Sequence, residues 1–528
     1  MKVLVTDPIS PKGVALLRET KGVTVVEKTK LPLDELKTLI ADADALIVRS
    51  ETKVTADVIA AAKKLKVVGR AGVGVDNIDA EAATTRGIIV MNSPDGNTNS
   101  TAEHAFSLLL SVARNIPQAH ASVKAGEWNR KAFQGAEICG KTLGIIGMGR
   151  IGTEVCRRAI AFGLRVIAYD PFLAPSRAKT LQVELVELPE LYRRADFITI
   201  HVPLTDETKG LIGKHSIAQM KPGVRIVNAA RGGIVDEQAL VEAIKAGKVA
   251  GAALDVFEEE PLPANSPLRA VPQIITTPHL GAATAEAQEL VGVEIAQSVV
   301  DALMGGIIRN AVNMPNIDAK TLELVRPYFE LAEKLGRLLA QLAPRRIERF
   351  TANYCGPVSE LDTNPITRAA LRGLLQHVAG KDVNVVNAPM VASNLGIKVE
   401  EVKVTAPADF TELIELRVQA DGQQTSVAGT FYGSHLNPRI VRINDTHVEA
   451  VPSGVLFIME NRDRPGVVGY IGTLMGKHKI NIASMSLGRD KRGGRALTIL
   501  NLDSLPDEKT IKDILRDKDI YSIKLAKL

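Results

Sequence analysis

The chain has 528 residues, a formal net charge of +5, 45% hydrophobic residues and 24% charged residues. This composition is typical of a globular α/β protein of several domains, and it excludes the disordered, fibrous and membrane classes. The positive charge is spread along the chain without a basic block, so we expect small anionic ligands and no nucleic-acid partner.

No apolar stretch reaches the roughly 20 residues that a membrane span needs, and the first residues, "MKVLVTDPIS", lack the features of a secretory signal. The three cysteines, Cys139, Cys156 and Cys355, lie far apart without the spacing of metal ligands. We therefore expect free thiols, no metal site, no membrane partner and a cytoplasmic location.

In the first part of the chain, short β-branched runs such as "KVLVT" and "ALIVRS" alternate with helical patterns. This alternation predicts βαβ units and a parallel sheet. A long helical pattern from Asn97 to about Ala125 indicates a domain boundary, because it is long enough to cross between lobes. We assign residues 1–96 and 285–311 to a first, substrate-binding lobe.

A second βαβ series, assigned to residues 97–284, begins at "KTLGIIGMGRIG". Gly147, Gly149 and Gly152 form a G-x-G-x-x-G pattern between an apolar strand and a helix, which predicts a dinucleotide site. The glycines allow a tight turn, close approach of a pyrophosphate, and close packing of helix on strand. Asp170 ends the next strand, near the spacing at which a carboxylate accepts ribose hydroxyls and favours NAD over NADP.

Three polar residues follow later strands of this series: Arg231 in "NAARGG", Glu260 in "VFEEEP" and His279 in "TPHLGAAT". Ligands of open α/β sheets bind at such carboxyl ends. Arginine can bind a carboxylate with two hydrogen bonds, histidine can accept a hydroxyl proton near neutral pH, and glutamate can orient the imidazole. The set predicts oxidation of a 2-hydroxy acid.

Residues 312–452 mix helices and strands without a catalytic motif, and we expect an α+β intervening domain there. Its Arg439, Arg442 and His447 form either an anion-binding cluster or an ordinary exposed sheet face. Residues 453–528 have the order strand, helix, strand, strand, helix, strand, which predicts a small ferredoxin-like domain.

The stretches "GRAGVGVDNID", "GKTLGIIGMGRIG", "NAARGGIVDE", "AALDVFEEEP" and "TPHLGAAT" resemble signatures of the D-2-hydroxy-acid dehydrogenase family, over about the first 310 residues. The resemblance implies two doubly wound parallel-sheet lobes, with an NAD-binding Rossmann-like domain inserted into a substrate domain. Within the family, the long phosphoglycerate-oxidising members are most similar. They imply oxidation of 3-phospho-D-glycerate to 3-phosphooxypyruvate, the first step of L-serine biosynthesis.

The resemblance also implies site residues beyond those above. The additional cofactor contacts are Arg150, Ile151, Val202, Ala229, Asp255 and Gly281, with Asp255 at the nicotinamide carboxamide. The implied substrate contacts are Arg49, Ser50, Arg70 and Arg130, the last reaching across a subunit interface.

The final segment resembles an ACT domain, a regulatory module, and residues 312–452 resemble the extra domain of the longer family members. This implies a homotetramer with L-serine as an effector at Asp463 and Asn481. Asn461 replaces a tyrosine of a serine-sensitive relative, so inhibition by serine is left open.

Two other functions also stay open: a dehydrogenase of another D-2-hydroxy acid such as glycerate or lactate, and a non-catalytic NAD(H)-sensing protein like the corepressors that share this fold.

Overall fold

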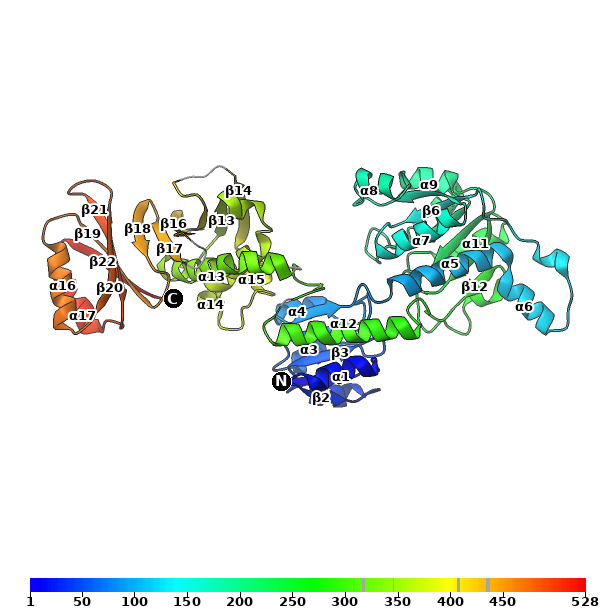
Figure 1. Cartoon of the computed structure of the whole chain (residues 1–528), viewed down its shortest axis with the longest axis horizontal. Helices are drawn as coiled ribbons and strands as arrows, with labels where there is room; N and C mark the ends of the chain where they lie inside the picture. The colour runs from blue at the N-terminus through cyan, green and yellow to red at the C-terminus, as the bar shows by residue number, and fades with distance from the viewer. Residues whose placement is uncertain (307, 316–318, 345, 406–408, 434–436) are drawn as a thin grey trace.

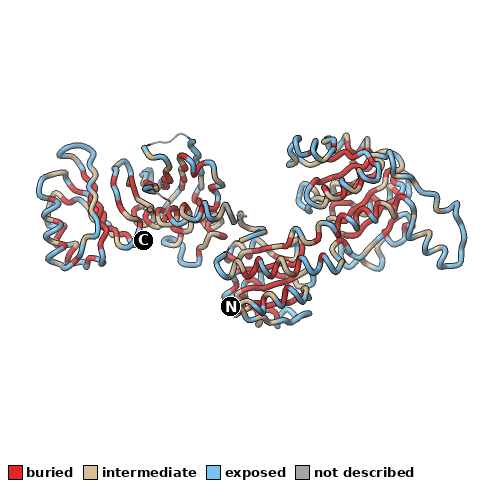
Figure 2. Tube along the Cα trace, viewed as in Figure 1, coloured by how far each residue is buried: buried red, intermediate tan, exposed pale blue. Residues whose placement is uncertain are grey.

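The structure is a computed structural model that describes residues 1–306, 308–315, 319–344, 346–405, 409–433 and 437–528. Within these described residues, four β-sheets follow one another along the chain. In Figure 1 the lobe that holds the N-terminus lies between a second α/β lobe and the C-terminal half. Buried residues, red in Figure 2, run through the middle of each part.

The first lobe is built on a parallel five-stranded sheet. Its elements are β1 (Lys2–Val5), α1 (Pro11–Glu19), β2 (Thr24–Glu27), α2 (Leu33–Ile40), β3 (Ala45–Val48), α3 (Ala56–Ala61), β4 (Val67–Arg70), α4 (Ala80–Thr85), β5 (Ile89–Asn92) and α12 (Ala285–Leu303). The strand order is β2-β1-β3-β4-β5. Helices α2, α3 and α4 cover one face, and α1 with α12 covers the other. The lobe is therefore doubly wound, as the family resemblance implies.

The second lobe contains a parallel seven-stranded sheet. Its elements are α5 (Thr98–Arg114), α6 (Ile116–Lys124), β6 (Thr142–Ile146), α7 (Arg150–Ala161), β7 (Arg165–Tyr169), α8 (Pro175–Thr180), β8 (Glu184–Leu185), α9 (Leu188–Arg194), β9 (Phe197–Ile200), α10 (Lys214–Gln219), β10 (Val224–Asn228), α11 (Glu237–Lys245), β11 (Val249–Leu254) and β12 (Ile274–Thr276). The order β12-β11-β10-β9-β6-β7-β8 reverses between β6 and β9, where α/β sheets bind ligands.

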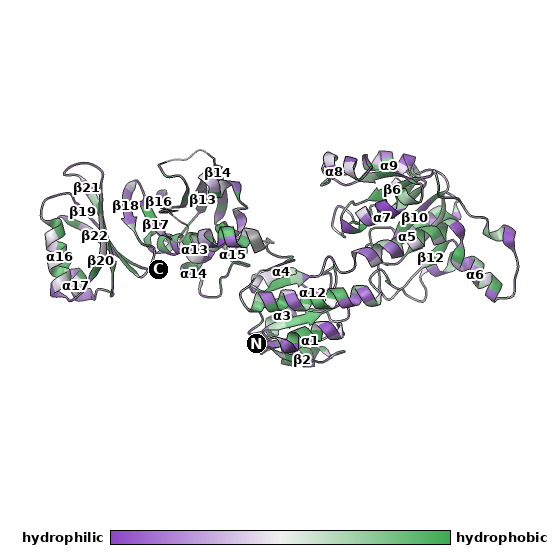
Figure 3. Cartoon of the chain, viewed as in Figure 1, coloured by the Kyte–Doolittle hydropathy of each residue, from purple (hydrophilic) through white to green (hydrophobic). Residues whose placement is uncertain are grey.

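The apolar residues of the second lobe explain its layers. Figure 3 shows green, apolar strands between helices whose outer surfaces are purple and hydrophilic. Helices α5 and α7 pack on one face of the sheet, and α9, α10 and α11 pack on the other. Near-continuous apolar runs such as "FITI" in β9 suit strands that are buried on both faces.

The single helix predicted from Asn97 to about Ala125 is instead two helices, α5 and α6. The break falls at Asn115, whose backbone is left-handed with φ 52°. Pro117 is the second residue of α6, a position that proline tolerates because its missing N–H group would have no partner within the helix there. The consequence is that α6 turns away and forms a projecting arm on the right of Figure 1.

The C-terminal half contains two further sheets. Its elements are α13 (Ala319–Leu342), β13 (Arg349–Cys355), α14 (Asn364–Ala379), α15 (Ala388–Asn394), β14 (Lys398–Val404), β15 (Leu413–Ala420), β16 (Gln423–Phe431), β17 (Pro438–Ile443), β18 (Thr446–Ala450), β19 (Val455–Arg462), α16 (Val467–Lys477), β20 (Ile482–Arg489), β21 (Arg495–Leu502), α17 (Glu508–Ile514) and β22 (Ile520–Lys527). The first sheet, β14-β13-β15-β16-β17-β18, is antiparallel except for β13 with β14. The second, β20-β21-β19-β22, is antiparallel and has the predicted ferredoxin-like order.

These two modules share one apolar core. Leu335 and Leu338 of α13 belong to the same buried cluster as Ile458 of β19 and Ile499 of β21. The other face of the last sheet is covered by α16 and α17. The central strands β19 and β21 of the C-terminal sheet are therefore covered on both faces within one chain, whereas the edge strand β20 has no buried residue. None of the described helices has the length and apolar character needed to cross a membrane.

The intervening module contacts the first lobe through asparagine side chains. Asn384 donates from Nδ2 to the carbonyl of Gly87 at 2.8 Å, and Asn387 donates to the carbonyl of Thr85 at 3.4 Å. A Cβ on Gly87 would lie 2.1 Å from Asn384 Nδ2. The C-terminal half is therefore held at the end of α4, directly before strand β5.

Candidate active site

The glycine-rich loop lies between β6 and α7, at the point where the strand order reverses. Gly147 has a left-handed φ of 93°, and a Cβ there would lie 2.5 Å from the carbonyl oxygen of His201. A Cβ on Gly152 would lie 2.0 Å from the carbonyl oxygen of Gly147, whereas Gly149 faces open space. The loop thus has the predicted tight turn, close packing and open approach, and it fits a pyrophosphate at the N-terminus of α7.

Asp170 follows β7 and is tied to the glycine-rich loop. Its Oδ2 accepts the Met148 N–H at 2.7 Å, and its Oδ1 accepts the Phe172 N–H at 2.8 Å. A carboxylate has about four acceptor positions, so two remain for ribose hydroxyls. The residue lines a cleft of about 700 Å³ together with Met148, Gly149, Arg150, Phe172 and Arg177.

The remaining predicted cofactor residues lie at the same edge of the sheet. Arg150 and Ile151 begin α7, and the residues after β9, β10, β11 and β12 include Val202, Ala229, Asp255 and Gly281. Arg150 Nε lies 2.8 Å from Asp95 Oδ1, in the segment between the lobes. Sequence reasoning missed Asp95, Phe172 and Arg177 as cleft residues, although Phe172 lies in the turn after Asp170 and Arg177 lies on the following helix α8.

Replacing Asp170 with asparagine should raise the Kd for NAD roughly tenfold or more and narrow the preference over NADP. The reason is that charge-assisted hydrogen bonds contribute about 1.5–3 kcal/mol each, while a neutral amide no longer repels a 2′-phosphate. The measurement is the Kd of both cofactors by fluorescence titration. An unchanged ratio of the two Kd values would refute this role.

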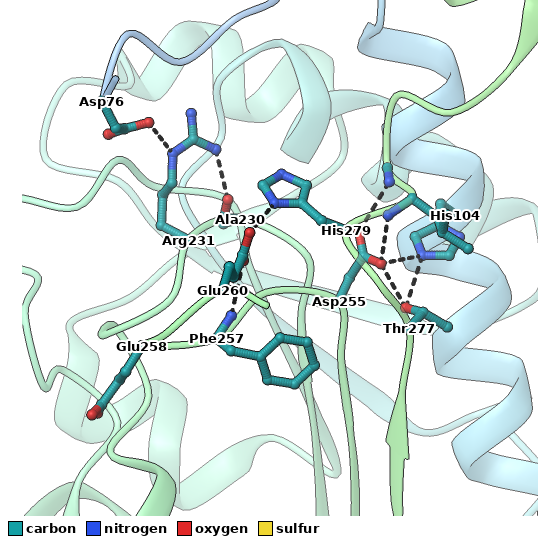
Figure 4. Close-up of polar contacts among 12 residues, drawn as sticks. Asp76, His104, Ala230, Arg231, Asp255, Phe257, Glu258, Glu260, Thr277 and His279 are labelled. Atoms are coloured by element: carbon teal, nitrogen blue, oxygen red, sulfur yellow. Dashed lines mark hydrogen bonds and ion pairs between the residues drawn. The ribbon is translucent and has the colours of Figure 1, made fainter. Parts of the chain in front are cut away.

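His279 and Glu260 form a hydrogen-bonded pair at the carboxyl edge (Figure 4). His279 Nδ1 lies 2.8 Å from Glu260 Oε2, and Glu260 Oε1 accepts the Phe257 N–H at 3.1 Å. Partial burial acts to raise the pKa of Glu260, but the hydrogen bond and charge of His279 outweigh it and lower this pKa below its ordinary value. Because the ionised carboxylate only accepts, Nδ1 carries the hydrogen, and Nε2 is left to accept a proton.

Arg231 reaches from the second lobe to the first. Its Nε donates to Asp76 Oδ2 at 3.0 Å, and its Nη1 donates to the carbonyl of Ala230 at 2.7 Å (Figure 4). These two contacts hold the guanidinium in place and leave further N–H groups for a substrate carboxylate. A Cβ on Gly74 would lie 1.9 Å from Arg231 Nη2, so the loop after β4 closes directly on this arginine.

Arg70 of the first lobe interacts with the charges of both Arg231 and Arg49. Arg49 follows β3 and Arg70 ends β4. Burial lowers the pKa of Arg70 to about 10, with contributions from the charges of Arg231 and Arg49, while Asp76 acts in the opposite direction. Three positive groups from two lobes therefore converge, which suits a ligand with more than one negative group.

The other two predicted substrate residues differ in position. Ser50 is exposed beside Arg49, at the same loop. Arg130 is also exposed, but it lies in a short 3-10 turn (Arg130–Phe133) that follows α6 on the projecting arm. Nearby Trp128 is 80% exposed. A single chain therefore does not bring Arg130 to the arginines of the cleft.

Asp255 is buried directly behind the loop that carries His279. It has no exposed surface, and its carboxylate accepts from Thr277 Oγ1 at 2.6 Å and from the N–H groups of Leu280 and Gly281 at 2.8 and 3.0 Å. His104 Nε2 lies 3.0 Å from the same carboxylate. The structure thus shows Asp255 holding the His279 loop, and its contact with the nicotinamide carboxamide stays a prediction.

The predicted effector residues each have a partner within the chain. Asp463 Oδ2 accepts from Arg489 Nη1 and from the Gly493 N–H, both at 3.0 Å. Asn481 Nδ2 donates to Asp503 Oδ2 at 2.7 Å. Their separate partners do not join Asp463 and Asn481 into one site within a single chain.

The predicted basic cluster of the intervening domain is paired with carboxylates. Arg442 Nη2 lies 3.0 Å from Glu415 Oε1, and Arg439 Nε lies 3.6 Å from Glu449 Oε1. His447 is 3.9 Å from Asp409. These contacts favour the second interpretation, an ion-paired sheet face. Among residues with described positions, no group of three or more His, Cys, Asp or Glu side chains could hold a metal ion.

A dinucleotide loop, a histidine–glutamate pair and an arginine held between the two lobes lie at one sheet edge, the arrangement expected of a nicotinamide-dependent dehydrogenase of small hydroxy acids. Comparison with known families agrees with this class. Residues 106–281 match the model described as "D-isomer specific 2-hydroxyacid dehydrogenase, NAD binding domain". Residues 324–444 match the "D-3-phosphoglycerate dehydrogenase intervening domain", and residues 455–518 match the "ACT domain".

Full-length relatives narrow the class. The D-3-phosphoglycerate dehydrogenase of Methanocaldococcus jannaschii is 47% identical over 99% of this chain and 100% of that protein. The enzyme of the same name from Archaeoglobus fulgidus is 46% identical over 98% of both chains. The crystal structure of D-lactate dehydrogenase from Aquifex aeolicus with NAD and lactic acid matches 60% of this chain and 100% of that chain, with a TM-score of 0.53 and 28% identity. The chain belongs to the D-3-phosphoglycerate dehydrogenase family and is an NAD-dependent enzyme.

Proposed function

We propose that the chain oxidises 3-phospho-D-glycerate to 3-phosphooxypyruvate with NAD, as the first step of L-serine biosynthesis. The observation that carries this proposal is the grouping of Arg49, Arg70 and Arg231: burial lowers the pKa of Arg70 first, and the charges of Arg231 and Arg49 lower it further. A substrate with one carboxylate and one phosphate has the complementary charges. The names of the full-length relatives support the same substrate.

In the proposed reaction Arg231 binds the carboxylate, while Arg49 and Arg70 bind the phosphate. His279 Nε2 accepts the proton of the substrate hydroxyl, and Glu260 stabilises the imidazolium that forms. When bound, NAD accepts the hydride from the substrate carbon that bears this hydroxyl. The Asp76 contact fixes Arg231 only while the two lobes are close together, so binding and closure are linked.

The test is NADH formation by the purified full chain with 3-phosphoglycerate, D-glycerate and D-lactate in parallel. Turnover restricted to the phosphorylated acid supports the proposal. Equal rates with all three acids would instead favour a dehydrogenase of broader D-2-hydroxy-acid specificity. Bound NADH without turnover in either direction would favour the NAD(H)-sensing protein.

Replacing Arg49 with glutamine should raise the KM for 3-phosphoglycerate by roughly 10- to 100-fold, since a charge-assisted hydrogen bond contributes about 1.5–3 kcal/mol. Any residual rate with D-glycerate should stay unchanged, because that acid lacks the phosphate. Lys53→Gln, at an exposed position in the same loop, is the matched control. Equal loss with both acids would remove Arg49 from the phosphate site.

Several further features belong to the same proposal. We propose a homotetramer in which Arg130 completes the substrate site of a neighbouring subunit; the exposed arm with Trp128 supports this. The proposed effector is L-serine at Asp463 and Asn481, supported by the ACT match. The proposed location is cytoplasmic, supported by three free cysteines.

The domain limits are also part of the proposal: 1–96 with 285–311, 97–284, 312–452 and 453–528. Their support is that each of the four sheets draws its strands from one of these stretches. The shared apolar core means that the last two stretches form one packed unit.

A further inference from the structure

Helix α5 is the first element of the second lobe, and it contacts the catalytic loop at two points. Thr101, which is 6% exposed, donates from Oγ1 to the carbonyl of Gly281 at 3.1 Å. One turn further on, His104 reaches the buried carboxylate of Asp255 (Figure 4). The loop from Thr277 to Gly281, which carries His279, is therefore attached to the helix that leads in from the other lobe.

The contacts of His104 fix which ring nitrogen carries a hydrogen. Its Nε2 lies 3.0 Å from Asp255 Oδ1 and 3.3 Å from Thr277 Oγ1. Thr277 already donates its hydroxyl hydrogen to the same carboxylate at 2.6 Å. Since the carboxylate has no hydrogen to give, His104 must be the donor through Nε2. The His104 side chain is 20% exposed and Asp255 is not exposed, so this network is shielded from water.

Asp255 in turn holds three consecutive residues of the loop. Its backbone carbonyl accepts the His279 N–H at 2.9 Å, and its carboxylate accepts the N–H groups of Leu280 and Gly281. His279 itself has φ 54°, a left-handed conformation that is costly for a residue other than glycine. Such a conformation persists only when surrounding contacts fix it. The direction of the imidazole toward Glu260 therefore depends on the position of Asp255.

We propose that His104 is a positioning residue for the reaction: through Asp255 it locks the loop that aims His279, and so links the inter-lobe helix α5 to the proton-accepting group. This inference rests on the proposed role of His279. His104 does not touch the substrate in this account. Its effect on rate is expected because a displacement of about 1 Å at the reacting groups can cost roughly a hundredfold in rate.

The test uses the full chain with His104→Leu, which removes the donor, and His104→Gln, which keeps one. We expect kcat for the leucine variant to fall roughly 10- to 100-fold, with the Kd for NAD and the KM for the acid within about threefold of wild type. The glutamine variant should recover most of the rate. With substrate deuterated at C2, the isotope effect on kcat should increase in the leucine variant, because the chemical step becomes limiting.

Glu103→Gln is the matched control on the same helix, because Glu103 is 64% exposed and, among the residues that the structure describes, forms an ion pair only with the half-buried Arg158 at 3.3 Å. Wild-type kcat in the leucine variant, equal loss in both His104 variants, or a loss confined to the Kd for NAD would each overturn the inference. If the leucine variant does not fold, Thr101→Val carries the test, with a several-fold lower kcat expected and an unchanged kcat contradicting it. Inactive wild-type protein would refute the proposed function instead.

Discussion

Replacing His279 with alanine is expected to lower kcat by roughly 10²- to 10⁴-fold, the range that general acid–base groups contribute. His279 Nδ1 is committed to Glu260 at 2.8 Å, so the proton of the substrate must go to Nε2, which alanine lacks. The Kd for NADH should stay within about twofold, since the glycine-rich loop and Asp170 lie on other strands. Single-turnover kinetics with 3-phosphoglycerate, together with NADH fluorescence, measure both quantities.

His215→Ala is the control for this substitution, because His215 is exposed on α10 of the same lobe. The alanine variant at position 279 should also return the pKa of Glu260 toward its ordinary value, because the stabilising imidazole is gone. In wild type the pKa of Glu260 is lowered, and the carboxylate is ionised at neutral pH. The stabilisation that the ionised carboxylate gives to the native state is lost only as the pH falls through this lowered pKa. A kcat that survives the change at His279 would show that another group accepts the proton.

The parts of the fold that local patterns encode could be predicted from the sequence. The glycine-rich loop could be recognised because a turn, an open approach and a close packing contact each require glycine within six residues. The two parallel sheets followed from β-branched runs that alternate with helices. Arg231, Glu260 and His279 could be placed together because carboxyl ends of parallel strands meet at one sheet edge.

Contacts between distant segments could not be predicted in this way. Asp76 and Arg231 are 155 positions apart and meet only because the lobes close on each other. His104 lies on a helix without any local motif, and its partner Asp255 comes 151 residues later, so no spacing indicates the pair. Arg442 of β17 forms its ion pair with Glu415 of β15, and strand β16 lies between these two strands in the sheet. In each case the missing information is tertiary pairing rather than residue type.

Charge alone was a poor guide to sites in the C-terminal half for the same reason. The sequence shows cations and an acid in suggestive positions, but Arg439 and Asp463 both find opposite charges within the chain. A binding site needs charge that the protein itself leaves uncompensated. In the catalytic cleft positive charge is in excess around Arg70: burial lowers its pKa first, and the charges of Arg231 and Arg49 lower it further against the opposing charges of Asp76 and Asp7.

Replacing Arg231 with lysine is expected to lower kcat/KM for 3-phosphoglycerate roughly 150-fold. This factor corresponds to about 3 kcal/mol of transition-state stabilisation, the upper value for a charge-assisted hydrogen bond. Lysine keeps the charge but has no planar fork, so it cannot contact Asp76, Ala230 and a substrate carboxylate together. The Kd for NAD should not change. Steady-state kinetics with Arg193→Lys as control measure the effect, since Arg193 is exposed on α9.

The same argument separates charge from orientation. Asp76→Asn keeps Arg231 and its charge but weakens the contact at Nε that fixes the guanidinium. It should therefore also lower kcat/KM, but by a smaller factor than Arg231→Lys. A double variant should lose less than the sum of the two single losses, because both act through one hydrogen-bonded unit. Full additivity would mean that Asp76 acts elsewhere in the cleft. Wild-type kcat/KM in Arg231→Lys would mean that positive charge alone binds the carboxylate, without the fixed fork.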